Sequence, residues 1–208
     1  MRETVRAASE RGVTIGAHVS YPDIPGFGRR ELGLDTSEIT HHVRLQIEAL
    51  SKVCVAAKTR VRYVKPHGAL YNRAARDPRA AAAVVTGIAA TDRRLILLGL
   101  AESEMARAAA AAGIGFAAEA FVDRAYSPQL RLVPREQPGA LIENVEEAVR
   151  RAVTLVQRRM MTTGEGAEIP LEAESLCVHG DNRDALELVT ALRLALESSG
   201  TRIAPFIT

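Results

Sequence analysis

The sequence contains few aromatic residues, no tryptophan and hardly any lysine. Phe, Tyr and Trp make up only 4% of its 208 residues. Nucleic-acid bases would therefore find few aromatic rings on which to stack. The net charge of +2 is spread along the chain instead of forming one basic stretch. Together these features argue against a nucleic-acid-binding protein.

Cysteine and long apolar runs are also scarce. The two cysteines, Cys54 and Cys177, have no CxxC neighbour, and the first residues are charged, unlike a signal peptide. The longest uncharged stretch, residues 80–91, is far shorter than the ~20 apolar residues that span a bilayer. We therefore expect a soluble, cytoplasmic protein without a membrane partner.

The composition is that of an ordinary globular domain. The chain is 47% hydrophobic, and no linker-like tract divides it, so we predict a single domain over residues 1–208. Short β-rich apolar runs alternate with helical patterns, which is typical of βαβ units and a parallel α/β sheet. The predicted strands cover residues 13–18, 61–64, 95–100, 113–118, 176–179 and 203–207, and the predicted helices cover 1–10, 35–57, 77–88, 105–112, 144–156 and 188–196. Capping signals are expected to start three of these helices and to end one: Asp35 with Glu38, Asp77 with Pro78, and Asn144 with Glu147 at the starts, and Gly113 at the end.

The first helical pattern has no strand before it. In a parallel sheet, a helix normally connects two strands, so a preceding strand is expected. We therefore expect residues 13–18 to form an open sheet edge, which natural proteins usually cover.

Polar side chains follow most of the predicted strands. Because parallel strands end on one face of the sheet, these groups can converge although they are distant in sequence. Each histidine taken alone has the alternative of a structural role, but three at equivalent strand ends favour a functional site. The candidates are His18, then Lys65 and His67, then Glu102, then Glu119, Asp123 and Arg124, and finally His179 and Asp181.

Lys65 is conspicuous because lysine is rare here. The chain has three lysines among its 27 Lys and Arg residues, and Lys65 stands with His67 where an apolar strand runs into a predicted loop. A lysine exposed to solvent and a hydrogen-bonded turn histidine remain the alternatives. His41 and His42 fall in mid-helix, where a solvated face is the better interpretation.

Two connections are too long for simple turns, residues 19–34 and 122–142. Long loops in compact domains are often functional, and Arg29 and Arg124 could bind a carboxylate or phosphate through two parallel hydrogen bonds. Solvated loop charges are the alternative for each arginine.

Several familiar catalytic motifs are absent from the sequence. It contains neither GxxxxGK[ST] nor GxGxxG, and it has no serine nucleophile elbow. No HExxH or HxxxH pair supplies two metal ligands from one element, so the sequence leaves open whether a metal is bound.

Seven motifs resemble those of the LamB/YcsF family, and the match spans residues 1–205. They are IGAHVSYPD (residues 15–23), GFGRR (26–30), VKPHGALYN (64–72), FVDRAY (121–126), LVPR (132–135), GALI (139–142) and VHGD (178–181). The sequence departs from the family pattern at Val19, Ala125 and Glu102. Family members also begin earlier, with two further strands, which agrees with the unpartnered first helix.

The resemblance implies a distorted, seven-stranded (β/α) barrel related to carbohydrate deacetylases. It also implies ATP-dependent opening of 5-oxoproline to glutamate, with Mg²⁺ accompanying ATP and with two partner subunits, B and C. Metal-dependent deacetylation or another amide hydrolysis is one alternative, and a non-catalytic assembly role is another.

The implied chemistry assigns hypothetical roles to the candidate residues. Acid–base catalysis would use His67, His179 and Asp181, while Lys65 would stabilise a phosphorylated oxygen. The remaining candidates are catalytic positions at His18 and Asp123 and substrate-binding positions at Arg124, Arg29, Asn72, Glu119 and Tyr21.

Overall fold

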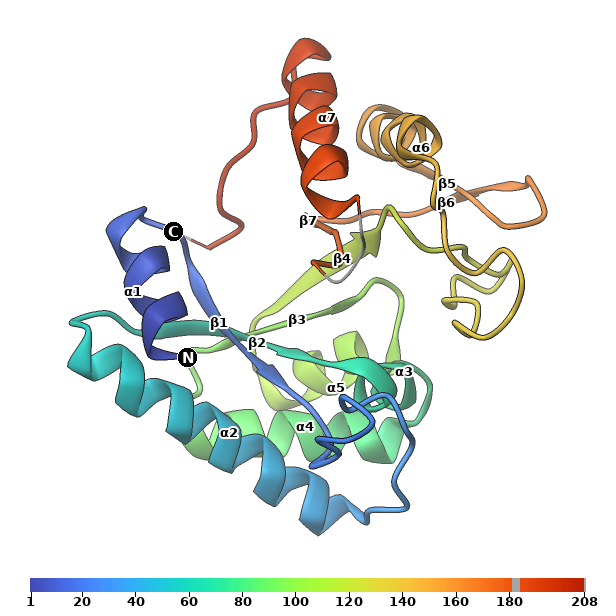
Figure 1. Ribbon diagram of the computed structural model, residues 1–208. Coiled ribbons are helices and arrows are strands. Elements are labelled where there is room, and N and C mark those ends of the chain that lie inside the picture. Colours follow the sequence, from blue (N-terminus) through green and yellow to red (C-terminus); the bar gives the residue numbers. More distant parts are fainter. Residues whose placement is uncertain (181–183, 208) are drawn as a thin grey trace. The chain divides into compact units, whose positions relative to one another are not determined.

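The computed structural model describes residues 1–180 and 184–207 (Figure 1). The chain folds as two compact units, one formed by residues 1–117 with Ile207 and the other by the described residues of 118–206. The predicted helix–strand alternation is present in both units. The structure does not test the expected single domain, which stays a prediction.

The first unit carries most of the helices. Its elements are α1 (Arg2–Glu10), β1 (Ile15–Val19), α2 (Thr36–Ala56), β2 (Val61–Pro66), α3 (Gly68–Arg76), α4 (Pro78–Thr91), β3 (Ile96–Leu100) and α5 (Glu104–Ala112). The chain enters the second unit within β4 (Phe116–Phe121). There follow α6 (Val145–Arg158), β5 (Met160–Thr162), β6 (Glu168–Pro170), β7 (Ser175–Cys177) and α7 (Ala185–Ser198).

The main sheet has five strands in the order β1-β2-β3-β4-β7. The pairings β1–β2, β2–β3 and β4–β7 are all parallel. Parallel strands alternating with helices confirm the predicted α/β fold of the (β/α) barrel-like class. β5 and β6 form a separate antiparallel pair.

Helix-capping signals in the sequence correctly predict where the helices begin. Asp35 and Glu38 form a capping box at the start of α2. The side chain of Asp77 accepts a hydrogen bond from the Arg79 N–H at the start of α4, and that of Asn144 caps α6 in the same way. α5 ends as predicted at Gly113, whose φ of 65° suits glycine.

Two strand predictions need correction. The predicted strand at residues 203–207 is wrong, because this segment forms no strand, Ile203 is 42% exposed and Pro205 has no N–H to donate. β4 covers 116–121 instead of the predicted 113–118. The shift arises because residue 113 caps α5, so the paired strand begins later.

Three elements were missed. Helix α3 starts immediately at Gly68, where a loop was expected, and buries Leu70 and Tyr71. Pro66 and Gly68 resemble loop signals and hide this helix start. The β5–β6 pair has strands of three residues, too short to show alternation.

β1 ends the sheet order, with β2 as its strand neighbour in the part of the chain that the structure describes. A cavity of about 580 Å³ lies against β1, between α1 and α2. Its lining is mainly apolar and includes Val5, Ile15, Ala17 and Leu50.

The crossing of α2 and α4 depends on Gly87. A Cβ at this position would lie 2.8 Å from Val43 Cγ1 and 2.9 Å from the Thr40 carbonyl oxygen.

We expect Gly87→Ala to lower the free energy of unfolding by about 1–3 kcal/mol, because overpacking outweighs the better helix propensity of alanine. Urea titration measures this, with exposed Thr86→Ala, expected to cost less than about 0.5 kcal/mol, as the control. A Gly87→Ala protein as stable as wild type would contradict the close approach.

Candidate functional site

In the first unit, His18 and His67 form a hydrogen-bonded pair. His18 lies on β1 directly opposite Lys65 on β2. His18 Nε2 is 3.0 Å from His67 Nδ1, and His18 Nδ1 is 3.1 Å from the Lys65 carbonyl oxygen. His67 Nε2 is 2.8 Å from the Phe27 carbonyl oxygen. The parallel pairing therefore brings together two of the predicted histidines and the backbone of the predicted lysine.

Glycines allow the loop before α2 to pack against the turn that carries His67. Gly68 has a φ of 57°, and a Cβ there would approach the Gly28 carbonyl oxygen to 2.4 Å. That oxygen accepts a hydrogen bond from the Ala69 N–H at 3.0 Å. A Cβ at Gly28 would lie 3.1 Å from His67 Cδ2. Side chains at either glycine would push the loop away from the histidine.

The same loop is held by an ion pair that sequence reasoning missed. Arg30 Nε lies 3.1 Å from both carboxylate oxygens of Asp23, and the Gly26 N–H donates to the same carboxylate at 3.0 Å. Asp23 and Arg30 each end one of the family motifs, and this is the feature of the sequence that could have indicated their importance. Their role here is to fix the backbone that supplies the Phe27 carbonyl.

The other predicted residues of this unit differ in exposure. The Tyr21 side chain is 2% exposed, and its hydroxyl accepts a hydrogen bond from Arg73 Nη1 at 3.3 Å. Arg29 is exposed and places its guanidinium 5.3 Å from the centre of the Phe27 ring. Asn72 is exposed on α3, and Lys65 is half-buried.

In the second unit, Asp123 and His179 form a second hydrogen-bonded pair. β4 and β7 are parallel, with Phe121 opposite Cys177, so both residues lie two positions past paired strand residues. His179 Nδ1 lies 2.8 Å from Asp123 Oδ2 and 3.0 Å from Oδ1. The His179 backbone N–H donates to Oδ2 at 3.1 Å, and the ring stacks on Phe121 at 5.5 Å.

These contacts determine which nitrogen of His179 carries the proton. A carboxylate can only accept, so Nδ1 must donate and a neutral ring presents a bare Nε2. Burial raises the pKa of Asp123, but the hydrogen bonds and charge of His179 outweigh it, and the pKa is lowered overall. An ionised carboxylate that orients a histidine is the usual arrangement of a general base.

Two buried arginines lie close to this pair. Arg124 is 5% exposed and donates from Nη2 to the Val133 carbonyl at 2.6 Å, while Arg151 on α6 donates to the Arg124 carbonyl at 3.1 Å. Burial, and then the nearby Arg135, lower the pKa of Arg124. A buried guanidinium beside another arginine favours binding of an anion.

Buried side chains also support the strand end. The Tyr126 hydroxyl, fully buried, accepts a hydrogen bond from the Phe121 N–H at 2.9 Å. Glu119 lies on β4 with a fully buried side chain. Sequence reasoning missed Arg151 and the role of Tyr126, although the latter falls in the FVDRAY motif.

The predicted site residues thus form two groups, one in each unit. Whether they share one cleft, as the sequence predicts, remains a prediction. Asp181 lies outside the described residues. Within residues 1–180 and 184–207, no three His, Cys, Asp or Glu side chains are grouped so as to hold a metal ion. No helix in these ranges is long and apolar enough to cross a membrane.

Parallel strands that alternate with helices and carry histidine and carboxylate groups at their carboxyl ends define a (β/α) barrel-like protein. The LamB/YcsF family matches residues 1–208, and the chain belongs to this family. The resemblance seen in the sequence motifs is thereby confirmed.

Relatives in this family have names that indicate their activity. The chain is 47% identical over 203 residues to the A subunit of 5-oxoprolinase from Paracidovorax citrulli, covering 98% of this chain and 81% of the relative. It is 46% identical to the A subunit of 5-oxoprolinase from Streptomyces avermitilis, and the match covers 99% of this chain and 82% of that relative. The crystal structure of a lactam utilization protein from Thermus thermophilus superposes on this chain with a TM-score of 0.92 at 40% sequence identity. The match covers 99% of this chain and 82% of that protein. The names of the first two describe them as parts of a multi-subunit enzyme.

The lowered pKa of Asp123 predicts a pH-dependent contribution to stability. A carboxyl group whose pKa is depressed by folding stabilises the protein above its unfolded pKa and loses this effect as pH falls through the folded pKa. We expect Asp123→Asn to cost about 2 kcal/mol at neutral pH, and the difference from wild type to shrink at acid pH. Urea unfolding across a pH series measures both effects.

The exposed Glu187→Gln serves as the matched control, since the Glu187 side chain lies on the surface of α7. Its difference from wild type should stay small at every pH. A stability difference for Asp123→Asn that did not change with pH would show that the carboxylate charge is not involved.

Proposed function

We propose that this chain is the A subunit of an ATP-dependent 5-oxoprolinase. The enzyme would hydrolyse the lactam of 5-oxo-L-proline to L-glutamate, with cleavage of ATP, together with subunits B and C. The observation that carries the proposal is the 47% identity, over 98% of this chain, to a protein named as the A subunit of 5-oxoprolinase. The lactam utilization protein with a TM-score of 0.92 supports the same substrate class.

The reaction needs ATP because a five-membered lactam is a stable amide. Transfer of the γ-phosphoryl group to the lactam oxygen would make the ring carbon electrophilic, and Mg²⁺ would accompany the nucleotide. Water would then attack this carbon, the ring C–N bond would break, and the nitrogen would take up a proton. Cleavage of the C–N bond would leave the new carboxyl group as an acyl phosphate, and a second water would hydrolyse this to release phosphate. One lactam, one ATP and two waters thus give glutamate, ADP, phosphate and a proton.

The Asp123–His179 pair is suited to activating that water. With Nδ1–H donated to Asp123 at 2.8 Å, the bare Nε2 of His179 can accept the proton of the attacking water. Asp123 keeps the ring in this tautomer and stabilises the imidazolium that forms. Asp181, two residues further on, is proposed as an additional acid or base.

The His18, Lys65 and His67 group is suited to stabilising developing charge. A lysine ammonium is a compact point charge, and we assign to that of Lys65 stabilisation of the phosphorylated oxygen. We also propose His67 as a general acid or base, for which its ring would have to exchange the hydrogen bond to His18 or to the Phe27 carbonyl for one to the reacting group.

Arginines are proposed to hold the substrate carboxylate. Arg124, buried next to Asp123, or Arg29, exposed in the loop before α2, could bind it through paired hydrogen bonds. Asn72, Glu119 and Tyr21 are proposed as further substrate contacts.

Two substitutions test this assignment in the enzyme assembled with its other subunits. We expect Lys65→Ala and His179→Ala each to lower ATP-dependent glutamate release by about 10²-fold or more, the usual effect of removing a positioned charge or base. Circular dichroism and urea unfolding would establish that both variants remain folded.

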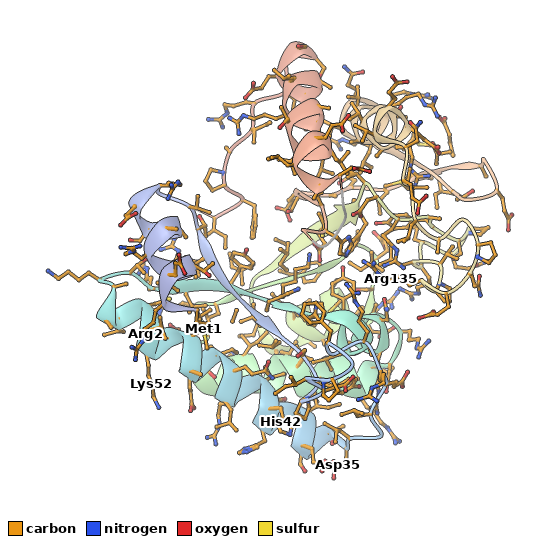
Figure 2. The ribbon with its side chains drawn as sticks, in the orientation of Figure 1. Met1, Arg2, Asp35, His42, Lys52 and Arg135 are labelled. Atoms are coloured by element: carbon orange, nitrogen blue, oxygen red, sulfur yellow. The ribbon has the colours of Figure 1, made fainter. Side chains whose placement is uncertain are left out.

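Matched controls come from α2, where Figure 2 shows Lys52 and His42 on one helix. Lys52→Ala and His42→Ala should turn over at the wild-type rate. Near wild-type turnover in Lys65→Ala or His179→Ala would remove that residue from the mechanism. Wild-type turnover in both would indicate that the chain acts in assembly and not in catalysis.

A further inference from the structure

The His18–His67 pair lies in a chain of three hydrogen bonds that uses all four ring nitrogens. The chain runs from the Lys65 carbonyl oxygen to His18 Nδ1 at 3.1 Å, from His18 Nε2 to His67 Nδ1 at 3.0 Å, and from His67 Nε2 to the Phe27 carbonyl oxygen at 2.8 Å. Carbonyl oxygens accept hydrogen bonds and cannot donate them. The two outer nitrogens, His18 Nδ1 and His67 Nε2, must therefore each carry a proton, and the two inner nitrogens are those that contact each other.

Counting protons distinguishes the charge states of this pair. Two neutral imidazoles have two N–H groups, and if both point to carbonyls, the inner nitrogens face each other as lone pairs at 3.0 Å. Two imidazolium rings have four N–H groups, so two N–H groups would collide at the same place. Only three protons satisfy three hydrogen bonds, and a pair with three protons carries a single positive charge.

We propose that His18 and His67 share one proton through an N–H···N hydrogen bond and act as a single unit with one positive charge. The extra proton comes from solvent, and no other bond forms or breaks. His18 is then a positioning residue, because it sets the protonation of His67 and holds its ring between two carbonyls. This role deepens the proposed function of His67, but the shared proton itself can be observed without measuring activity.

The surrounding backbone explains why the rings stay in this arrangement. The backbone N–H of His67 donates a hydrogen bond at 2.8 Å to the carbonyl of Val19, the residue after His18 on β1. Gly28 and Gly68 let the loop that carries the Phe27 carbonyl approach His67 closely. Both outer acceptors therefore belong to fixed backbone, and neither can turn to donate a proton.

Other charged groups on these elements influence how the pair titrates. A second proton would place two positive charges about one hydrogen bond apart, so the two protonation steps should be well separated. Charged groups on the elements that supply the two carbonyls include Lys65 on β2 and, in the loop before α2, Arg29 and the ion pair of Asp23 with Arg30.

The direct test is a pH titration of the full chain, labelled with ¹⁵N-histidine and followed by NMR of the ring nitrogens. At neutral pH we expect the outer nitrogens to be protonated and the two inner nitrogens to have shifts between those of bare and protonated nitrogen. We also expect scalar coupling between the inner nitrogens across the hydrogen bond. His18→Gln, whose amide can donate to His67 Nδ1, should abolish both signals and leave His67 neutral.

Exposed His41 provides the control, because His41→Gln should leave the signals of the pair unchanged. The proposal would be overturned by bare shifts at both inner nitrogens, or by two histidines that titrate independently, as separate side chains do. It would also be overturned if removal of metal ions with EDTA changed the inner-nitrogen signals, since a metal ion would then occupy the place of the proton.

Discussion

The parallel hydrogen-bonded register between neighbouring strands is the constraint on which both groups of candidate residues depend. It sets His18 opposite Lys65, 47 positions away, and its continuation past β4 and β7 brings Asp123 to His179, 56 positions away. A shift of one residue in either pairing would turn these side chains to the opposite face of the sheet. The chemistry of each group therefore rests on backbone geometry set by apolar strands.

The two groups use histidine in different ways. In one, an ionised carboxylate accepts from His179 and leaves its Nε2 as a base. In the other, two backbone carbonyls accept from His18 and His67, which favours an added proton. The hydrogen-bond acceptors around each histidine thus decide its behaviour: His179 is set up to accept a proton, and the His18–His67 pair is set up to hold one.

The sequence predicted the parts of this structure that depend on local signals. Caps such as Asp35 and Asn144, together with the periodic helices, were correct, and polar groups were correctly expected at strand ends. Helix α3 was missed because Pro66 and Gly68 resemble loop signals. Residues 203–207 were wrongly predicted as a strand, because apolar residues alone do not show whether a segment pairs with a neighbouring strand. The Phe27 carbonyl and Arg151 could not be predicted, since their roles arise only from tertiary contacts.

The central claim is that this chain supplies an essential part of an ATP-dependent 5-oxoprolinase. The most direct measurement combines the purified chain with subunits B and C, 5-oxoproline, ATP and Mg²⁺, and follows glutamate and ADP together. The account predicts that both products form in equal amounts and that omitting this chain abolishes glutamate release. Glutamate release at the same rate without this chain would contradict it.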